Sequence, residues 1–168
     1  MTLREALERS ESHIKRLEPA FQEKVARWFR ECFAKKVFVL IYCSSRTPEE
    51  QEKLYALGRT KPGQKVTNAR GIPPQSLHID LGKGARAIDF VPIAQSGTGW
   101  QIAWEDKETY AIAHKMAEAS GGLRRLDWEE PHLEDASVSG WRELVAPQKT
   151  ETKTKKRASS KKPWAGEK

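Results

Sequence analysis

The first third of the chain carries apolar residues at helical spacing, and a dense apolar run follows it. The spacing over 3–17 predicts a helix that is interrupted near 10–12, and the spacing over 19–35 predicts a second amphipathic helix. Pro19 suits the first turn of that second helix. The run 36–45, KVFVLIYCSS, is short, continuous and rich in β-branched and aromatic residues, which predicts a buried strand.

The segment after this strand has the clearest helix start in the chain. Thr47 suits the N-cap, Pro48 the first helical position, and Glu50 the reciprocal position of a capping box. Gly58 is expected to end this helix. Residues 59–77 are rich in Gly, Pro and Asn, and loops of this length in compact domains tend to be functional or disordered.

The rest of the pattern predicts a small sheet and two more helices. Segments 77–81 (LHIDL) and 85–93 (ARAIDFVPI) are predicted strands, joined into a hairpin by the glycine-rich turn between them. A helix, a strand and a short closing helix are predicted over 106–122, 131–135 and 138–145. This order indicates an α+β fold with a small antiparallel sheet flanked by helices.

The positive charge of the chain is concentrated near its C-terminus. The formal net charge is +7 over 168 residues, and residues 149–162 contribute seven Lys or Arg against one Glu. We therefore predict a folded domain over 1–146 and a disordered basic tail over 147–168. The tail is expected to contact anionic surfaces, whereas the folded part is expected to be a monomer that binds no nucleic acid.

The N-terminus and the two cysteines exclude several classes of protein. No apolar run approaches the roughly 20 residues that a membrane helix needs. The first residues, MTLREALERSESH, are charged and helical in pattern, so the chain is expected to be made without a signal peptide. Cys32 and Cys43 lie in apolar surroundings and form no CxxC pair, which predicts buried free thiols rather than a cysteine-based zinc site.

Two of the four histidines are candidates for metal binding. His13 and His114 lie in helical patterns without ligand-type neighbours, which is typical of surface or structural residues. His78 and His132 lie on predicted strands beside acidic residues. Catalytic zinc takes three protein ligands and leaves a fourth position to water, and His78, Asp89 and His132 supply such a set. The predicted hairpin would bring residues 78 and 89 opposite each other, and a neighbouring strand would add residue 132.

Hydrolysis at such a site also needs a carboxylate that accepts a proton from the attacking water. Glu129 and Glu130 are the candidates, and the absence of HExxH excludes a helix-borne zinc site of that type. Arg46 has two interpretations at this stage. It is either a surface residue at a helix start, or a guanidinium that holds a substrate carboxylate or steadies an oxyanion.

Four stretches of the chain, SSRTPEEQEKLYALGRTKPGQKVTNARG, SLH, ARAIDF and EEPHLE, resemble the VanY-type and L-alanyl-D-glutamate peptidases. The resemblance runs from about residue 13 to residue 145. Several members of this family are bacteriophage endolysins, and their fold is shared with hedgehog N-terminal domains. The resemblance implies zinc bound by His78, Asp89 and His132. It also implies a catalytic carboxylate three residues before His132 and a substrate-facing Arg46.

The chain departs from the family pattern in two places. The aspartate follows the first histidine by eleven residues instead of seven, which fits a lengthened hairpin loop and leaves Asp80 as the alternative to Asp89. The segment before EEPH is shortened, so the base is less clear. Alternation along a strand favours Glu130 beside His132, whereas the family spacing favours Glu129 and requires a bulge. We prefer Asp89 and Glu129.

Together with the resemblance, these residues predict a zinc-dependent peptidoglycan peptidase. The resemblance alone implies an endolysin that hydrolyses the L-alanyl-D-glutamate bond of stem peptides and so lyses the cell. The resemblance implies that it is made in the host cytoplasm and reaches the wall through a holin lesion. One alternative is a D-alanyl-D-alanine carboxypeptidase with the same metal site. Another is a non-catalytic module that binds the wall or nucleic acid through its basic tail.

Overall fold

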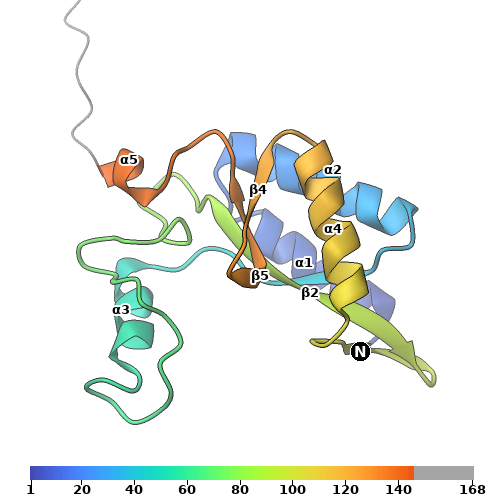
Figure 1. Cartoon of the computed structure of the whole chain (residues 1–168), viewed down its shortest axis with the longest axis horizontal. Helices are drawn as coiled ribbons and strands as arrows, with labels where there is room; N and C mark the ends of the chain where they lie inside the picture. The colour runs from blue at the N-terminus through green and yellow to red at the C-terminus, as the bar shows by residue number, and fades with distance from the viewer. Residues whose placement is uncertain (146–168) are drawn as a thin grey trace, which may run out of the picture.

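Figure 1 shows the computed structural model of the chain, which describes residues 1–145. The predicted tail over 147–168 lies outside the described residues. Among the described residues, no helix is both long and apolar enough to cross a membrane. The helices are α1 (Leu3–Ile14), α2 (Pro19–Ala34), α3 (Pro48–Ala56), α4 (Lys107–Ala119) and α5 (Trp141–Val145). The strands are β1 (Val39–Cys43), β2 (Ala87–Ser96), β3 (Gly99–Ile102), β4 (Leu123–Leu126) and β5 (Glu129–Asp135).

The strands form one antiparallel sheet in the order β1-β2-β5-β4, with β3 paired to the far end of β2. This arrangement confirms the predicted α+β class with a small antiparallel sheet and flanking helices. Strand β2 is central because it pairs with β1 on one side and with β5 on the other. Its register places Asp89 directly opposite Cys43 of β1 and His132 of β5.

Helices α1, α2 and α4 pack against the sheet and enclose the main hydrophobic core (Figure 1). On β2, Ile88 and Phe90 belong to this core, so Asp89 between them lies on the opposite face. Trp28 of α2 packs edge-on against Phe90 with ring centroids 5.2 Å apart. Its indole Nε1 donates to the carbonyl of Ala113 on α4 at 3.0 Å, which ties the two helices together.

Helix α3 and the loop after it form a lobe (residues 48–76) that stands apart from the core at the lower left of Figure 1. The helix begins as predicted, since Thr47 and Glu50 form a reciprocal capping box. Gly58 follows the helix with a φ of 66°, a left-handed conformation that favours glycine. The predicted long loop over 59–77 contains no helix or strand.

The predicted hairpin over 77–93 is wrong. Residues 77–81 form no strand, because their backbone is bonded to the segment after β1: the amide of Arg46 donates to the carbonyl of His78, and the amide of Asp80 donates to the carbonyl of Arg46, both at 2.9 Å. The carboxylate of Asp80 accepts hydrogen bonds from the amides of the next turn, those of Gly82, Lys83 and Gly84. The Asp80 carboxylate therefore stabilises the turn over residues 80–84.

The predicted interruption of the first helix is also wrong, since α1 runs unbroken through Ser10. Ser10 is fully buried, and its hydroxyl donates to the carbonyl of Ala6 at 2.8 Å. The same oxygen accepts a hydrogen bond from the amide of Ile41 at 3.0 Å, which joins α1 to β1. Ser10 is a polar residue that by itself favours a helix break. Here both of its hydrogen bonds are made within the protein, and they join the helix to the sheet. Strands β3 and β4 were not predicted.

Asp135, at the end of β5, is a fully buried anchor between β5, α2 and the start of β2. Its carboxylate binds Lys24 Nζ at 2.7 Å, Arg86 Nη1, and the amide and hydroxyl of Ser137. Burial raises the pKa of Asp135, but the bond from Lys24 and those from Ser137 outweigh burial and hold the pKa below its usual range. Its stabilising effect is therefore present near neutral pH and is lost as the pH falls.

We expect Asp135→Ala to lower the free energy of unfolding by about 2–3 kcal/mol, because the half-buried Lys24 and Arg86 lose a fully buried carboxylate partner. Urea unfolding at neutral pH measures the change. The matched control is Asp127→Ala, since the Asp127 side chain is 84% exposed and should shift the free energy by less than about 0.5 kcal/mol. Equal stability of the two variants would contradict the role of Asp135 as an anchor.

Candidate metal centre

Two candidate ligands face each other across neighbouring strands. Asp89 on β2 and His132 on β5 are direct antiparallel partners, so both side chains lie on the same face of the sheet. His132 Nδ1 lies 3.2 Å from Asp89 Oδ1. The neighbouring pair, Ile88 and Leu133, lies in the core on the other face. Strand alternation thus separates the polar pair from the apolar pair.

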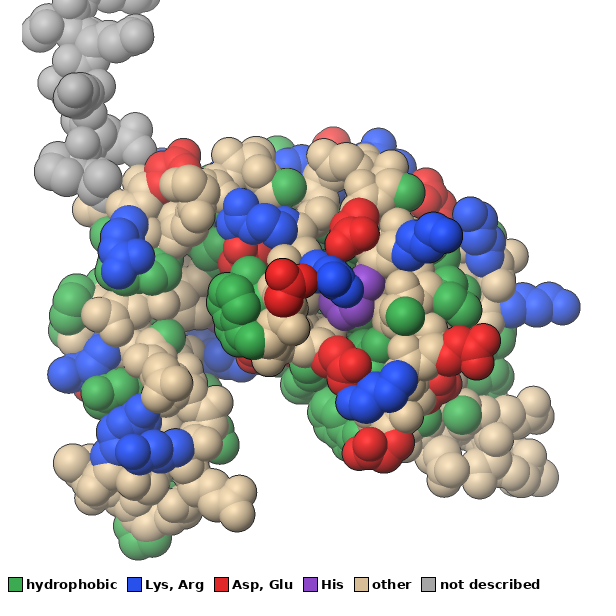
Figure 2. Space-filling model, in the orientation of Figure 1, with side chains coloured by type: hydrophobic (Ala, Val, Ile, Leu, Met, Phe, Trp, Pro, Cys, Tyr) green, Lys and Arg blue, Asp and Glu red, His purple; other side chains and the backbone are tan. Residues whose placement is uncertain are grey.

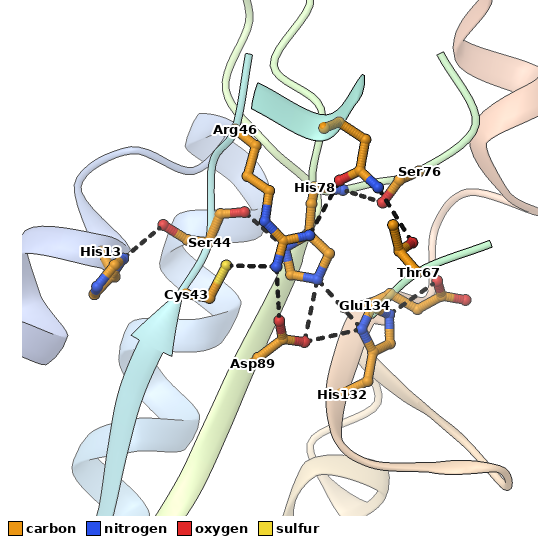
Figure 3. A network of polar contacts seen from close by, with 11 residues as sticks. His13, Cys43, Ser44, Arg46, Thr67, Ser76, His78, Asp89, His132 and Glu134 are labelled. Carbon is orange, nitrogen blue, oxygen red and sulfur yellow. Dashed lines mark hydrogen bonds and ion pairs between the residues drawn. The ribbon is translucent and has the colours of Figure 1, made fainter. Parts of the chain in front are cut away.

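His78 completes the group from the loop, not from a strand (Figure 3). Its Nε2 lies 3.2 Å from Asp89 Oδ1 and 3.3 Å from His132 Nδ1. The three predicted ligands therefore bring one atom each to a common point, although the sequence separates them by up to 54 positions. All three residues are buried, with exposed fractions of 4–6%. These three residues are a candidate metal site, and we call them the metal-binding group.

The remaining polar atom of each ligand has a partner of its own. His78 Nδ1 donates to the carbonyl of Ser44 at 2.6 Å, and His132 Nε2 lies 3.5 Å from Glu134 Oε2. Arg46 Nη2 donates to Asp89 Oδ2 at 3.3 Å. Such outer partners fix which ring nitrogen is free to bind a metal and hold the ligands in orientation.

Asp89 carries a buried negative charge within this group. Burial raises the pKa of Asp89, but hydrogen bonds from His132 and His78 outweigh it and hold the pKa below its usual range. Burial lowers the pKa of His78, but its hydrogen bond to Asp89 outweighs burial and raises the pKa to about 9. Asp89 thus attracts positive charge to this point, either as protons on the imidazoles or as a cation that displaces them.

Besides these three residues, two overlapping sets of side chains could hold a metal ion. In one, ligand atoms of Asp89, Glu129 and His132 all lie within 4.8 Å of one another. In the other, the same holds for Cys43, His78 and Asp89. The sulfur of Cys43 also accepts a hydrogen bond from Arg46 Nη2 at 2.9 Å, which occupies it. Cys43 is a free thiol, as predicted, and it is half-buried. Cys32 is a free, buried thiol, also as predicted.

Glu129 and Glu130 face different parts of the molecule. The carboxylate of Glu129 is exposed and lies beside Asp89 and His132. The carboxylate of Glu130 instead pairs with Lys107 Nζ of α4 at 2.5 Å. The cause is a bulge in β5, where the pairing with β4 shifts just before His132. Strand alternation is broken there. Glu130, although it is nearer to His132 in sequence, therefore points away from the metal-binding group and toward α4.

Arg46 lies at the edge of the metal-binding group and has several partners. Its guanidinium donates to Gln51 of α3 at 3.2 Å, in addition to Cys43 and Asp89. Gln51 is fully buried and in turn donates to the carbonyl of Ala69 at 3.0 Å, which anchors the lobe. Arg46 therefore orients Asp89 and connects the metal-binding group to the lobe. It is not a free surface residue.

A cleft of about 980 Å³ leads to the metal-binding group, which lies at its floor. Figure 2 shows the hollow between the lobe and the body of the molecule, on a face where Lys, Arg, Asp and Glu side chains are mixed. Trp128, in the turn before Glu129, is 80% exposed. Apolar side chains line both walls: Leu54, Leu57 and Val66 on the lobe, and Leu126, Trp128 and Trp141 opposite.

Three residues that border this group were not predicted from the sequence. Ser44 and Glu134 hold the outer nitrogens of the two histidines. Tyr42 lines the cleft, and burial followed by the charge of Asp89 raises the pKa of its hydroxyl, which therefore remains a hydrogen-bond donor. Glu134 alone carried a sequence signal, since it lies two residues after His132 and shares its strand face.

No family model matches the chain, and no curated protein matches it.

Proposed function

We propose that the protein is a zinc-dependent peptidoglycan peptidase with the hedgehog and D-alanyl-D-alanine peptidase type of fold, acting as an endolysin on the L-alanyl-D-glutamate bond of stem peptides. One observation carries the proposal. Three neighbouring ligand atoms meet at the floor of a cleft, with the carboxylate of Glu129 beside them. This combination is typical of a hydrolytic metal site.

The geometry of the metal-binding group fits zinc. Ligand atoms at about 2.0–2.1 Å from a tetrahedral zinc ion lie about 3.3–3.4 Å from one another. The three atoms of His78, Asp89 and His132 are separated by 3.2–3.3 Å. Two imidazoles and one carboxylate are ligands that zinc accepts, and three protein ligands leave a position open on the cleft side. The outer partners of all three support the same assignment.

A bound zinc ion would supply Lewis acidity and make water a nucleophile near neutral pH. Glu129 is placed to accept a proton from the attacking water and to return it to the leaving amine. The protonated hydroxyl of Tyr42 is a donor on the wall of the cleft, suited to an oxygen that gains negative charge. Arg46 holds Asp89 and lies on the same wall, where its positive charge favours a substrate carboxylate.

The choice of substrate rests on the resemblance of the sequence to peptidoglycan peptidases. The cleft is compatible with it, because peptidoglycan stem peptides combine short aliphatic side chains with free carboxylates. The walls supply apolar side chains, while Arg46 and Arg142 supply positive charge. Arg142 stacks over the ring of Trp141, with its guanidinium carbon 4.4 Å from the ring centroid, which holds it in place.

Digestion of purified peptidoglycan, followed by mass spectrometry of the new termini, tests this function. A new amino group on D-glutamate supports the endopeptidase. Release of D-alanine would instead support a D-alanyl-D-alanine carboxypeptidase with the same metal site. Binding of the protein to the wall without any new terminus would contradict a peptidase and leave a binding module.

The cellular setting is proposed from the same resemblance. The protein would be made in the host cytoplasm, would cross the inner membrane through a holin lesion, and would act on the wall as a monomer. The metal-binding group and its outer partners come from one chain, so catalysis would need no second copy.

We expect removal of residues 147–168 to slow lysis of intact cells by about tenfold or more at low salt, because clustered Lys and Arg raise the local concentration of a protein at an anionic envelope. High salt should remove the difference. Cleavage of soluble wall fragments should not change. If truncation abolishes cleavage of soluble fragments, the tail is part of the catalytic unit and its proposed role is wrong.

A further inference from the structure

We propose that His114 is a positioning residue: from α4 it holds the backbone of Glu130, and this directs Glu129 toward the metal-binding group. The inference rests on the proposed function, because it assigns a role in placing the base. The sequence pattern indicated only a surface or structural histidine. In the structure, His114 is buried, with an exposed fraction of 4%, and it contacts the strand that carries the base.

The contact is a hydrogen bond from the imidazole to the main chain. His114 Nε2 lies 2.7 Å from the carbonyl oxygen of Glu130, so Nε2 carries the proton and donates. The other nitrogen, Nδ1, is buried and has no partner among the described residues. Burial lowers the pKa of His114, which favours the neutral form of the ring. The imidazole of His114 thus makes one hydrogen bond among the described residues, from Nε2 to the carbonyl oxygen of Glu130.

The ring is fixed by aromatic neighbours. The centroid of His114 lies 5.3 Å from that of Phe90 on β2, and it stacks on Tyr110 of the same helix at 6.4 Å. Phe90 is the residue after Asp89 on β2, and its side chain lies on the core face of the strand. The imidazole is therefore held against the sheet and has little freedom to follow a moving strand.

Helix α4 holds Glu130 at a second point. Lys107 Nζ pairs with the Glu130 carboxylate at 2.5 Å. Lys107 and His114 are seven residues apart, which places them on the same face of the helix two turns from each other. One face of α4 therefore holds both the side chain and the main chain of Glu130. The ion pair is exposed and contributes little, so the partly buried hydrogen bond from His114 is the stronger restraint.

The restraint acts where β5 departs from regular pairing. Between the pairs Arg125–Leu133 and Leu126–Glu129, β4 advances by one residue and β5 by four. The additional residues, 130–132, form the bulge that carries Glu130 to α4 and leaves Glu129 at the cleft. The Glu130 carbonyl lies in an interrupted ladder without a strand partner, and His114 provides its donor.

A matched pair of variants tests the role of the donor. His114→Phe keeps an aromatic ring but lacks the donor, whereas His114→Gln can place an amide NH near the position of Nε2. We expect His114→Phe to lower kcat by about 10- to 100-fold, since misplacing a catalytic group by about 1 Å costs up to about 10²-fold. KM and zinc content should stay within about twofold. His114→Gln should recover most of the lost kcat.

A double variant separates positioning from a loss of stability. If His114 acts through Glu129, His114→Phe should not lower the residual rate further when Glu129 is already alanine. An additional tenfold loss in that background would overturn the inference. Full activity of His114→Phe, with Glu129→Ala inactive, would overturn it too but leave the proposed function intact.

The hydrogen bond can also be tested in the unaltered protein. Nitrogen-15 NMR of the histidine rings at neutral pH should show His114 as the Nε2–H tautomer with slow proton exchange. The Nδ1–H tautomer would overturn the inference even if no variant folds. This measurement does not depend on activity, so a protein that cleaves no stem peptide would contradict the proposed function without obscuring the result.

Discussion

Glu129→Ala should keep its fold and its zinc and lose about 10²- to 10⁴-fold in kcat, because a general base typically contributes that much. The carboxylate lies within 4.8 Å of ligand atoms of Asp89 and His132, close enough to contact a water at the open metal position. It is exposed at the cleft, so its removal leaves no buried group without a partner. Zinc content and thermal unfolding measure the first part of the prediction, and turnover of wall fragments measures the second.

Glu130→Ala is the matched control for this experiment. Its carboxylate binds Lys107 on the surface of α4, while its main-chain carbonyl, which His114 holds, is unchanged by the substitution. Activity should therefore stay within about tenfold of the parent. The reverse result, an inactive Glu130→Ala with an active Glu129→Ala, would mean that regular strand alternation governs the start of β5 and that the bulge does not place the base.

Each of His78→Ala, Asp89→Ala and His132→Ala should lose metal, and a chelator should abolish activity of the parent until zinc is restored. The loss of affinity should exceed the roughly 10- to 100-fold that removal of an outer partner costs, because a direct ligand disappears. Glu134→Gln provides that comparison, since Glu134 contacts only the outer nitrogen of His132 within the group. Competition with a chromogenic chelator measures all four affinities.

Asp80→Ala distinguishes the two aspartates that the sequence left open. The Asp80 carboxylate is bonded to the amides of its own turn, so its loss should leave zinc affinity unchanged. Full zinc content in Asp89→Ala would contradict the choice of ligands. Loss of zinc in Asp80→Ala with a stable fold would point to the same conclusion.

Local sequence signals were sufficient for the starts of α2, α3 and α4, but not for the course of α1 through Ser10. The capping box at Thr47, the proline at the start of α2 and the aspartate before α4 act within one turn, so their effect does not depend on the rest of the chain. The strands that are buried in the core, β1 and β2, were predicted for a similar reason, because a dense apolar run reports burial. The short strands β3 and β4 carry few apolar residues and gave no such signal.

The candidate ligands could be named from the sequence, but the way in which they meet could not. His78 was expected on a hairpin opposite Asp89, and the structure places it on a loop fixed by backbone bonds to Arg46. Asp89 instead lies opposite His132. Pairing between distant segments depends on which surfaces the whole chain can bury together, and a local pattern holds no information about that choice.

The sequence by itself determined the α+β class, the starts of the main helices and the residue types available for a metal site, because each depends on the side chains of one segment. Only the tertiary structure decided between Asp80 and Asp89 and between Glu129 and Glu130 as neighbours of that site. The first choice follows from a turn that uses the Asp80 carboxylate. The second follows from a bulge held by α4, where contacts with a helix distant in the chain override strand alternation.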